Sequence, residues 1–136
     1  MANLRTTNYD TSILTLRDNK YEVASYTNDT YATLTLSQGT LFGRVATTDK
    51  VVPLYTDAAD GSQYPVGILT IDQTVEAGET IDLNMVIAGE VAAELLVLNV
   101  GDTLEAVVDD RRLKDWIKDM GVFLITVTGL SQLDNQ

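Results

Sequence analysis

The chain has 136 residues, 45% of them hydrophobic and 21% charged, which is the size and composition of one ordinary globular domain. It contains neither cysteine nor histidine, and this excludes disulfides, zinc fingers, thiolate nucleophiles and the histidine-based catalytic triads. An enzyme would have to rely on carboxylates, lysine or tyrosine. The composition therefore favours a protein with no catalytic activity.

The net charge of −11 is unevenly distributed along the chain. Residues 1–50 carry equal numbers of cationic and acidic side chains, whereas residues 51–110 contain no lysine or arginine. Such an acidic surface repels phosphate, so we expect no nucleic-acid partner. The N-terminus lacks the apolar region of a signal peptide, and the longest apolar run, residues 91–100, is too short to span a bilayer. We expect synthesis in the cytoplasm and no membrane partner.

Residues 1–38 are rich in threonine and poor in large apolar side chains. Short alternations of apolar and polar residues predict strands at residues 12–16, 21–26 and 31–36, separated by turns at Asn19-Lys20 and Asn28-Asp29. Two interpretations stay open for this segment. It is either an extended arm that pairs with another protein or a set of extra strands in the domain's own sheet. Its low apolar content favours the arm for at least residues 1–17.

Residues 39–136 show the regular strand and turn signals of a β-rich domain. We predict strands at residues 40–46, 51–55, 66–72, 80–91 and 122–127. A polar turn is expected at residues 73–79, and residues 92–100 are apolar on both faces, which predicts burial. The predicted class is mainly β with a minor helical part (α+β).

One helix is predicted near the C-terminus, where an apolar stripe repeats at helical spacing. Asp109 and Asp110 suit the helix start, where carboxylates interact favourably with the helix dipole. Gly121 is well placed to cap the end. The stripe consists of Val108, Leu113, Trp116, Ile117 and Met120.

None of the candidate chemical motifs fits its chemistry. If Gly61 took the sixth position of a calcium loop, the first and third positions would be threonine and alanine, so the ligand pattern fails. The acid pairs Glu76/Glu79 and Asp109/Asp110 lie in a turn and at a helix start, not across a cleft as glycoside hydrolysis requires. Gly39 and Gly43 lack the spacing of a phosphate loop. We therefore expect no catalytic residue, no cofactor and no metal.

From Gly39 onward the sequence resembles the phage lambda-type head decoration proteins. The resemblance covers about residues 39–127 and rests on four stretches in the family's order. They are Gly39-Thr-Leu-Phe-Gly43-Arg44-Val45, then Ala59-Asp60-Gly61-Ser62-Gln63 leading into Val66-Gly67-Ile68-Leu69, then Val86-Ile87-Ala88-Gly89-Glu90-Val91, and finally Leu113 with Gly121-Val122.

The resemblance implies a compact β-rich decoration domain at residues 39–136, preceded by an N-terminal arm or extra strands at residues 1–38. It also implies a homotrimer on the outer surface of the expanded capsid, which stabilises the shell by binding the major capsid protein. The residues expected to touch the coat protein precede or begin the matched region. They are Thr30, Tyr31, Ala32, Thr33, Leu34, Thr35, Leu36, Ser37, Gln38 and Gly39.

Two other functions remain open at this point. One is a different β-rich virion or baseplate adaptor. The other is a carbohydrate-binding module, for which the six tyrosines could supply exposed aromatic rings.

Overall fold

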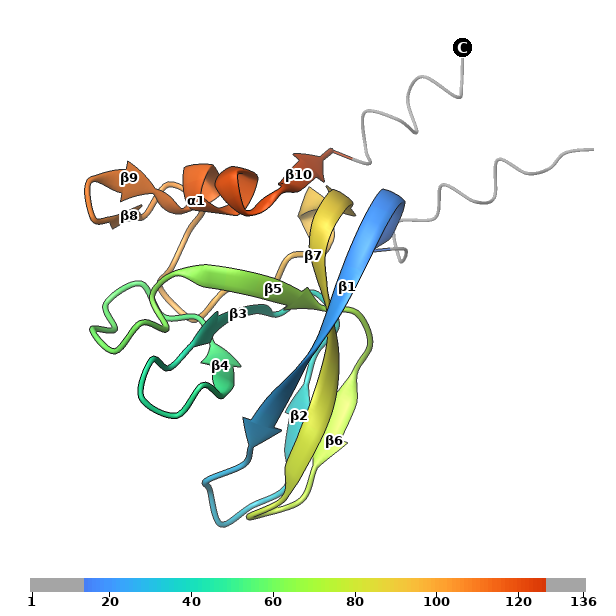
Figure 1. Ribbon diagram of the computed structural model, residues 1–136, viewed down its shortest axis with the longest axis vertical. Coiled ribbons are helices and arrows are strands. Elements are labelled where there is room, and N and C mark those ends of the chain that lie inside the picture. Colours follow the sequence, from blue (N-terminus) through green and yellow to red (C-terminus); the bar gives the residue numbers. More distant parts are fainter. Residues whose placement is uncertain (1–13, 127–136) are drawn as a thin grey trace, which may run out of the picture.

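The computed structural model describes residues 14–126 and shows a mainly β protein with antiparallel sheets and one short α-helix in that range (Figure 1). The predicted class is confirmed. The principal sheet has six strands. Five follow the order β1 (Thr15–Thr27), β7 (Thr80–Ala92), β5 (Pro65–Leu69), β3 (Leu41–Arg44) and β4 (Val51–Pro53), and β10 (Val122–Ile125) pairs with β7 in parallel.

Two small sheets and the helical segments complete the described chain. One sheet pairs β2 (Leu34–Leu36) with β6 (Gln73–Val75), and the other pairs β8 (Val107–Val108) with β9 (Arg111–Arg112). A 3₁₀ turn, η2, spans Ala93–Leu95, and helix α1 spans Leu113–Met120.

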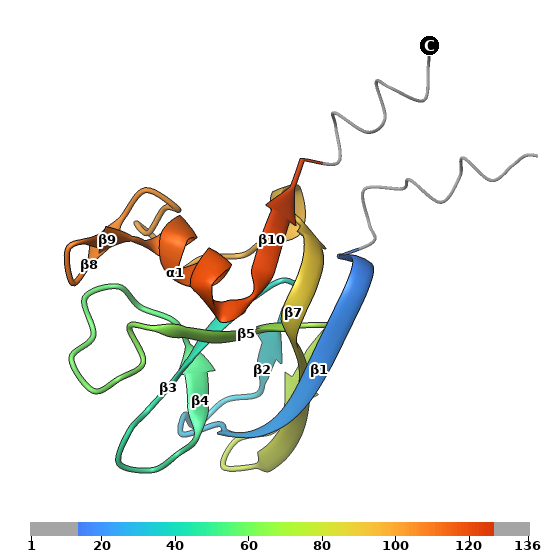
Figure 2. The ribbon, with the colours of Figure 1, turned by 45° about the horizontal axis from the view of Figure 1, so that its top comes forward.

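Strand β7 organises the fold because both of its edges are paired. One edge carries β1, in a register that runs from Thr15 opposite Val91 to Thr27 opposite Thr80. The other edge is shared by β5 at Met85–Val86 and by β10 at Gly89–Ala92. Figure 2 shows β1 and β10 on either side of β7, so the two ends of the described chain flank the same end of this strand.

The core consists of two clusters of buried side chains. One cluster lies beneath α1 and β10 and comprises Leu14, Leu41, Leu54, Ile68, Val86, Val91, Leu113, Ile117 and Val122. The other lies toward β2 and β6 and comprises Ala24, Tyr26, Leu36, Phe42, Val51, Leu69, Val75, Leu83 and Met85. β7 contributes to both clusters.

Residues 14–38 belong to the body of the domain and are not an arm. β1 pairs along the length of β7, and Ala24 and Tyr26 on β1 are buried in the second cluster. The arm predicted for residues 1–17 is therefore wrong for residues 14–17, because Leu14 is buried in the first cluster and the residues after it pair with β7. Residues 1–13 lie outside the described part of the chain.

The turn predicted at Asn19-Lys20 is also wrong, because β1 continues through it as a bulge. Asp18 takes a left-handed conformation with φ of 57°, and the Asn19 side-chain amide donates to the Glu90 carbonyl at 3.0 Å. Gly89, with φ of 107°, accepts the bulge: a Cβ there would lie 2.6 Å from the Asp18 carbonyl oxygen. The Asn19 side chain thus links β1 to β7 by a hydrogen bond.

Three further predictions need correction. Residues 73–75 form strand β6 and not the start of a turn, since they pair with β2. Residues 93–100 are not buried. Asp109 and Asp110, with φ of 49° and 66°, form the tight turn between β8 and β9, so the helix begins only at Leu113.

The predicted helix itself is confirmed over Leu113–Met120 and at its end, but Val108 of the predicted stripe lies in strand β8. Leu113 and Ile117 are buried, while Trp116 is half-buried. Gly121 is left-handed, and its amide donates to the carbonyls of Ile117 and Lys118, as a glycine cap requires.

Candidate functional site

The ten residues predicted to contact a partner begin in a loop that a buried asparagine holds in place. Asn28 is fully buried, and its side-chain amide donates to the carbonyls of Ala32 (2.8 Å) and Val75 (3.0 Å). Its side-chain oxygen accepts from the Thr30 amide (3.0 Å) and the Thr30 hydroxyl (2.7 Å). An asparagine side chain can make four hydrogen bonds, so this one is fully satisfied. At the tip of the loop Tyr31 is 103% exposed.

The later members of the ten have structural tasks. Leu34–Leu36 forms β2, which pairs with β6, and the Leu36 side chain is 6% exposed within the core. The backbone amide of Gln38 donates to the Asp72 carboxylate at 2.6 Å. Gly39 has φ of 90°, and a Cβ on it would overlap the Leu95 carbonyl oxygen. Leu36 and Gly39 are therefore buried, and they hold the backbone beneath the exposed residues of this segment.

A neutral groove lies beside β2 and connects the predicted residues with a segment far along the chain. It encloses about 260 Å³. No charged side chain lines it, in a protein whose net charge is −11. We call it the neutral groove, and its lining residues are Thr35, Leu36, Ser37, Thr40, Leu41, Pro53, Val97, Leu98, Asn99 and Val100.

Residues 97–100 were not predicted as part of a site. The Val97 amide donates to the Gly39 carbonyl at 2.8 Å, and the Val97 carbonyl accepts from the Leu41 amide at 3.1 Å. These bonds hold the segment against β3 while the side chains of Val97 and Val100 remain 41% and 95% exposed. The sequence signal that could have indicated a surface position for this segment was the pair of turn-forming residues Asn99 and Gly101 at the end of the apolar run.

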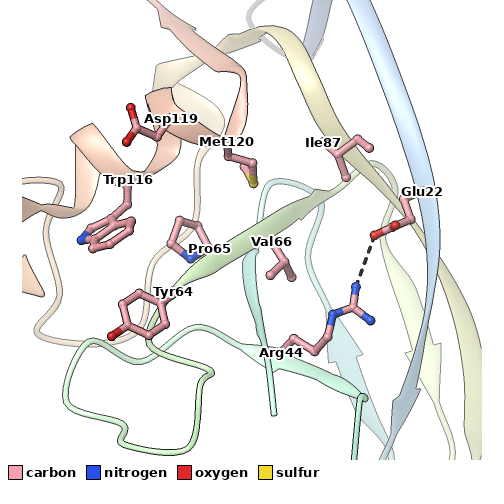
Figure 3. A pocket seen from close by; sticks show the side chains of 9 residues that line it. All are labelled: Glu22, Arg44, Tyr64, Pro65, Val66, Ile87, Trp116, Asp119 and Met120. Atoms are coloured by element: carbon pink, nitrogen blue, oxygen red, sulfur yellow. Dashed lines mark hydrogen bonds and ion pairs between the residues drawn. The ribbon is translucent and has the colours of Figure 1, made fainter. Parts of the chain in front are cut away.

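A second hollow, the aromatic cup, lies on another part of the surface between α1, β5, β7 and β1 (Figure 3). Its volume is about 520 Å³, and Val66, Ile87 and Met120 contribute apolar lining. The rings of Tyr64 and Trp116 meet edge to face with centroids 5.1 Å apart. The Trp116 indole donates to the Val108 carbonyl at 2.8 Å.

The charged groups around the aromatic cup are paired with each other. Arg44 contacts Glu22 at 3.2 Å, and Arg111 contacts Asp119 at 2.6 Å. The Arg111 guanidinium also lies 4.5 Å from the centroid of the Trp116 ring. Tyr64 donates its hydroxyl proton to Asp109. Each charged side chain that lines the hollow therefore already has an ion-pair partner.

No protein-family model matches the chain, and no curated protein matches it in sequence.

The acids considered for metal binding or catalysis are engaged locally. Hydrogen bonds from the Ser62 hydroxyl (2.6 Å) and the Ser62 amide (3.0 Å) hold the pKa of the Asp60 carboxyl below its ordinary value. The Glu79 carboxylate accepts from the Glu76 amide at 2.8 Å. Across residues 14–126 no three acidic side chains gather into a group that could hold a metal ion. The same residues contain no helix long and apolar enough to cross a membrane.

Proposed function

We propose that the protein is a structural virion protein of the lambda-type head decoration family. In this proposal it has no enzymatic activity. After synthesis in the host cytoplasm it binds the major capsid protein on the outer surface of the expanded capsid, as a homotrimer, and stabilises the shell. The observation that carries the proposal is the neutral groove with its exposed valines, because a charge-free apolar surface on a strongly acidic protein suits a protein partner.

The residues that carry the family resemblance are ones that this fold requires, which supports a resemblance of architecture. A Cβ on Gly43 would overlap the Ser62 carbonyl oxygen, and one on Gly67 would lie 2.9 Å from the Met85 side chain. Gly39 and Gly89 have positive φ, and a Cβ on either would also lie closer than 3.0 Å to a backbone oxygen. Four glycines of the matched stretches are thus fixed by packing, and a protein that shares them is expected to share the sheet.

The size of the neutral groove favours a multivalent attachment. Burying a valine side chain completely contributes roughly 1.5–3 kcal/mol. Two valines therefore contribute less than the free energy of about −8 kcal/mol that micromolar binding requires. Three linked copies would attach far more tightly than one, which is the physical reason for a trimer on the shell.

The test is to titrate expanded, undecorated phage capsids with the purified protein and to count the bound copies. We expect saturation at a multiple of three copies. The double variant Val97→Ser/Val100→Ser should bind at least tenfold more weakly. Val107→Ser is the matched control, because Val107 is 62% exposed in β8 and does not line the groove. Saturable binding that the double variant retains in full would contradict the proposed surface, and failure of the unmodified protein to bind would contradict the function.

The alternative of another β-rich virion or baseplate adaptor predicts binding to a tail or baseplate component and none to the capsid. The same titration with isolated tails in place of capsids distinguishes the adaptor from the decoration protein. Preference for tails would replace the decoration proposal.

A carbohydrate-binding module is the second candidate, and the aromatic cup is the observation that favours it. Trp116 is the sole tryptophan of the chain, so its fluorescence reports on this hollow alone. Titration with a panel of oligosaccharides should leave the emission unchanged if decoration is the function. A saturable change in emission, together with a rise in melting temperature that Trp116→Phe no longer shows, would favour carbohydrate binding.

A further inference from the structure

We propose that the loop of residues 28–32 is a pre-formed anchor that inserts Tyr31 into an apolar pocket of the coat protein rimmed by lysine or arginine. This inference rests on the proposed function and specifies its docking element. It replaces strand addition by a flexible arm with docking of a rigid loop, because the structure already pairs β2 with β6.

The rigidity of the loop comes from bonds at its base and across its turn. The Asn28 amide donates to the Glu79 carbonyl at 2.9 Å, and the Asn28 carbonyl accepts from the Gly78 amide at 2.8 Å. The side-chain bonds of Asn28 to Thr30 and Ala32 then fix the two neighbours of Tyr31. The backbone that carries the tyrosine is consequently ordered before any partner arrives.

A loop that is ordered before the partner binds increases the affinity of the complex. Immobilising a loop on binding costs free energy, and a loop that is already fixed avoids most of that cost. Tyrosine loses few rotatable bonds on burial and combines a large apolar ring with a hydroxyl, which is why it is frequent among interface residues that dominate binding. Tyr31 leaves its whole ring in water in this structure, at 103% exposure, so the full area of the ring is available to a partner.

The charges around the loop indicate the chemistry of the partner. Asp29 follows Asn28 directly, and Glu76 and Glu79 belong to the turn that is hydrogen-bonded to Asn28; all three are exposed. The cation bonded at this end is Lys50, whose ammonium donates to the Thr27 hydroxyl at 2.8 Å. Exposed acids on the loop and on the turn bonded to it are complementary to a pocket with a basic rim.

The loop and the neutral groove belong to one continuous stretch of chain. Tyr31 precedes Thr35, which lines the groove, by four residues, so the two lie within about 14 Å of each other along an extended chain. One coat-protein surface can therefore contact both.

The experiment measures binding of full-length variants to expanded, undecorated capsids, with the melting temperature of each variant recorded in parallel. We expect Tyr31→Ala to bind at least tenfold more weakly with an unchanged melting temperature, and Tyr31→Phe to bind nearly as well as the original protein. Tyr21→Ala is the matched control, because Tyr21 is a 49% exposed tyrosine on β1. It should bind normally.

The outcomes distinguish the anchor from the function on which it rests. Equal binding by the original protein and Tyr31→Ala would overturn the anchor and leave the proposed function intact. Failure of the original protein to bind would overturn both. Raising the salt concentration should weaken binding if the rim is basic. A salt-independent affinity would overturn the assignment of the partner's charge.

Discussion

Strand β1 and the segment of residues 93–100 both adjoin β7, but they are stabilised in different ways. β1 is rich in polar residues, lies along one whole edge of β7 and buries Ala24 and Tyr26. Residues 93–100 include three leucines and two valines, continue from the end of β7, and none of them is buried. Backbone pairing holds the first segment in the core, whereas the second packs Leu95, Leu96 and Leu98 partly against the first cluster and leaves two valines exposed. Val97 and Val100 are therefore the apolar side chains of this segment that are available to a partner.

The largest expected effect comes from removing β1. Deletion of residues 1–38 would expose one edge of β7 and remove Leu14, Ala24, Tyr26 and Leu36 from the core, so we expect the truncated protein to be unfolded. Deletion of residues 1–13 leaves every described contact in place and should preserve the fold. Circular dichroism and thermal melting of both truncations check this. A cooperative β-sheet melt from the longer deletion would show that β1 is dispensable.

A smaller change compares one side chain from each segment. Tyr26 is 6% exposed and meets Phe42 edge to face with centroids 6.2 Å apart. Tyr26→Ala should lower the free energy of unfolding by about 3–5 kcal/mol. Val100→Ala, at a side chain that is 95% exposed, should change it by less than about 0.5 kcal/mol. Urea titration measures both, and similar losses from the two substitutions would remove the distinction between the segments.

The bulge that lets β1 follow β7 provides the next test. Gly89→Ala would place a methyl group 2.6 Å from the Asp18 carbonyl at a φ of 107°, so we expect a loss of roughly 2–4 kcal/mol. Gly78→Ala is the control, because its φ of 75° is also positive but nothing lies within 4 Å. It should cost about 1 kcal/mol. Equal costs at the two sites would mean that the bulge is not tightly packed.

The sequence was sufficient to predict the class, most of the β3 to β7 strands and the glycine cap of the helix, because alternation and turn residues are local signals. It was insufficient for β1, whose position depends on the free edge of a strand some sixty residues later. It also missed Val97 and Val100, since an apolar run carries no mark of whether the core has room for it. Tyr31 was included among the candidates, but only the bonds of Asn28 show that its loop is fixed.

The smallest expected effect depends on pH and concerns the loop beside β3. Because hydrogen bonds from Ser62 lower the pKa of Asp60, this carboxylate stabilises the fold above its ordinary pKa of 3.8, and the contribution disappears as the pH falls through the lower folded-state value. The difference in unfolding free energy between the original protein and Asp60→Asn should therefore be largest near neutral pH and shrink below pH 4. A difference that is constant from pH 7 to pH 2 would contradict this assignment.

We propose that the protein docks through the neutral groove and the loop before it, while β1 stabilises the sheet. Hydrogen exchange of the capsid-bound protein, followed peptide by peptide and compared with the free protein, tests it most directly. We expect new protection in residues 29–37 and 97–101 and unchanged exchange in β1. Protection confined to β1, or to the surface of α1 and β10, would contradict it.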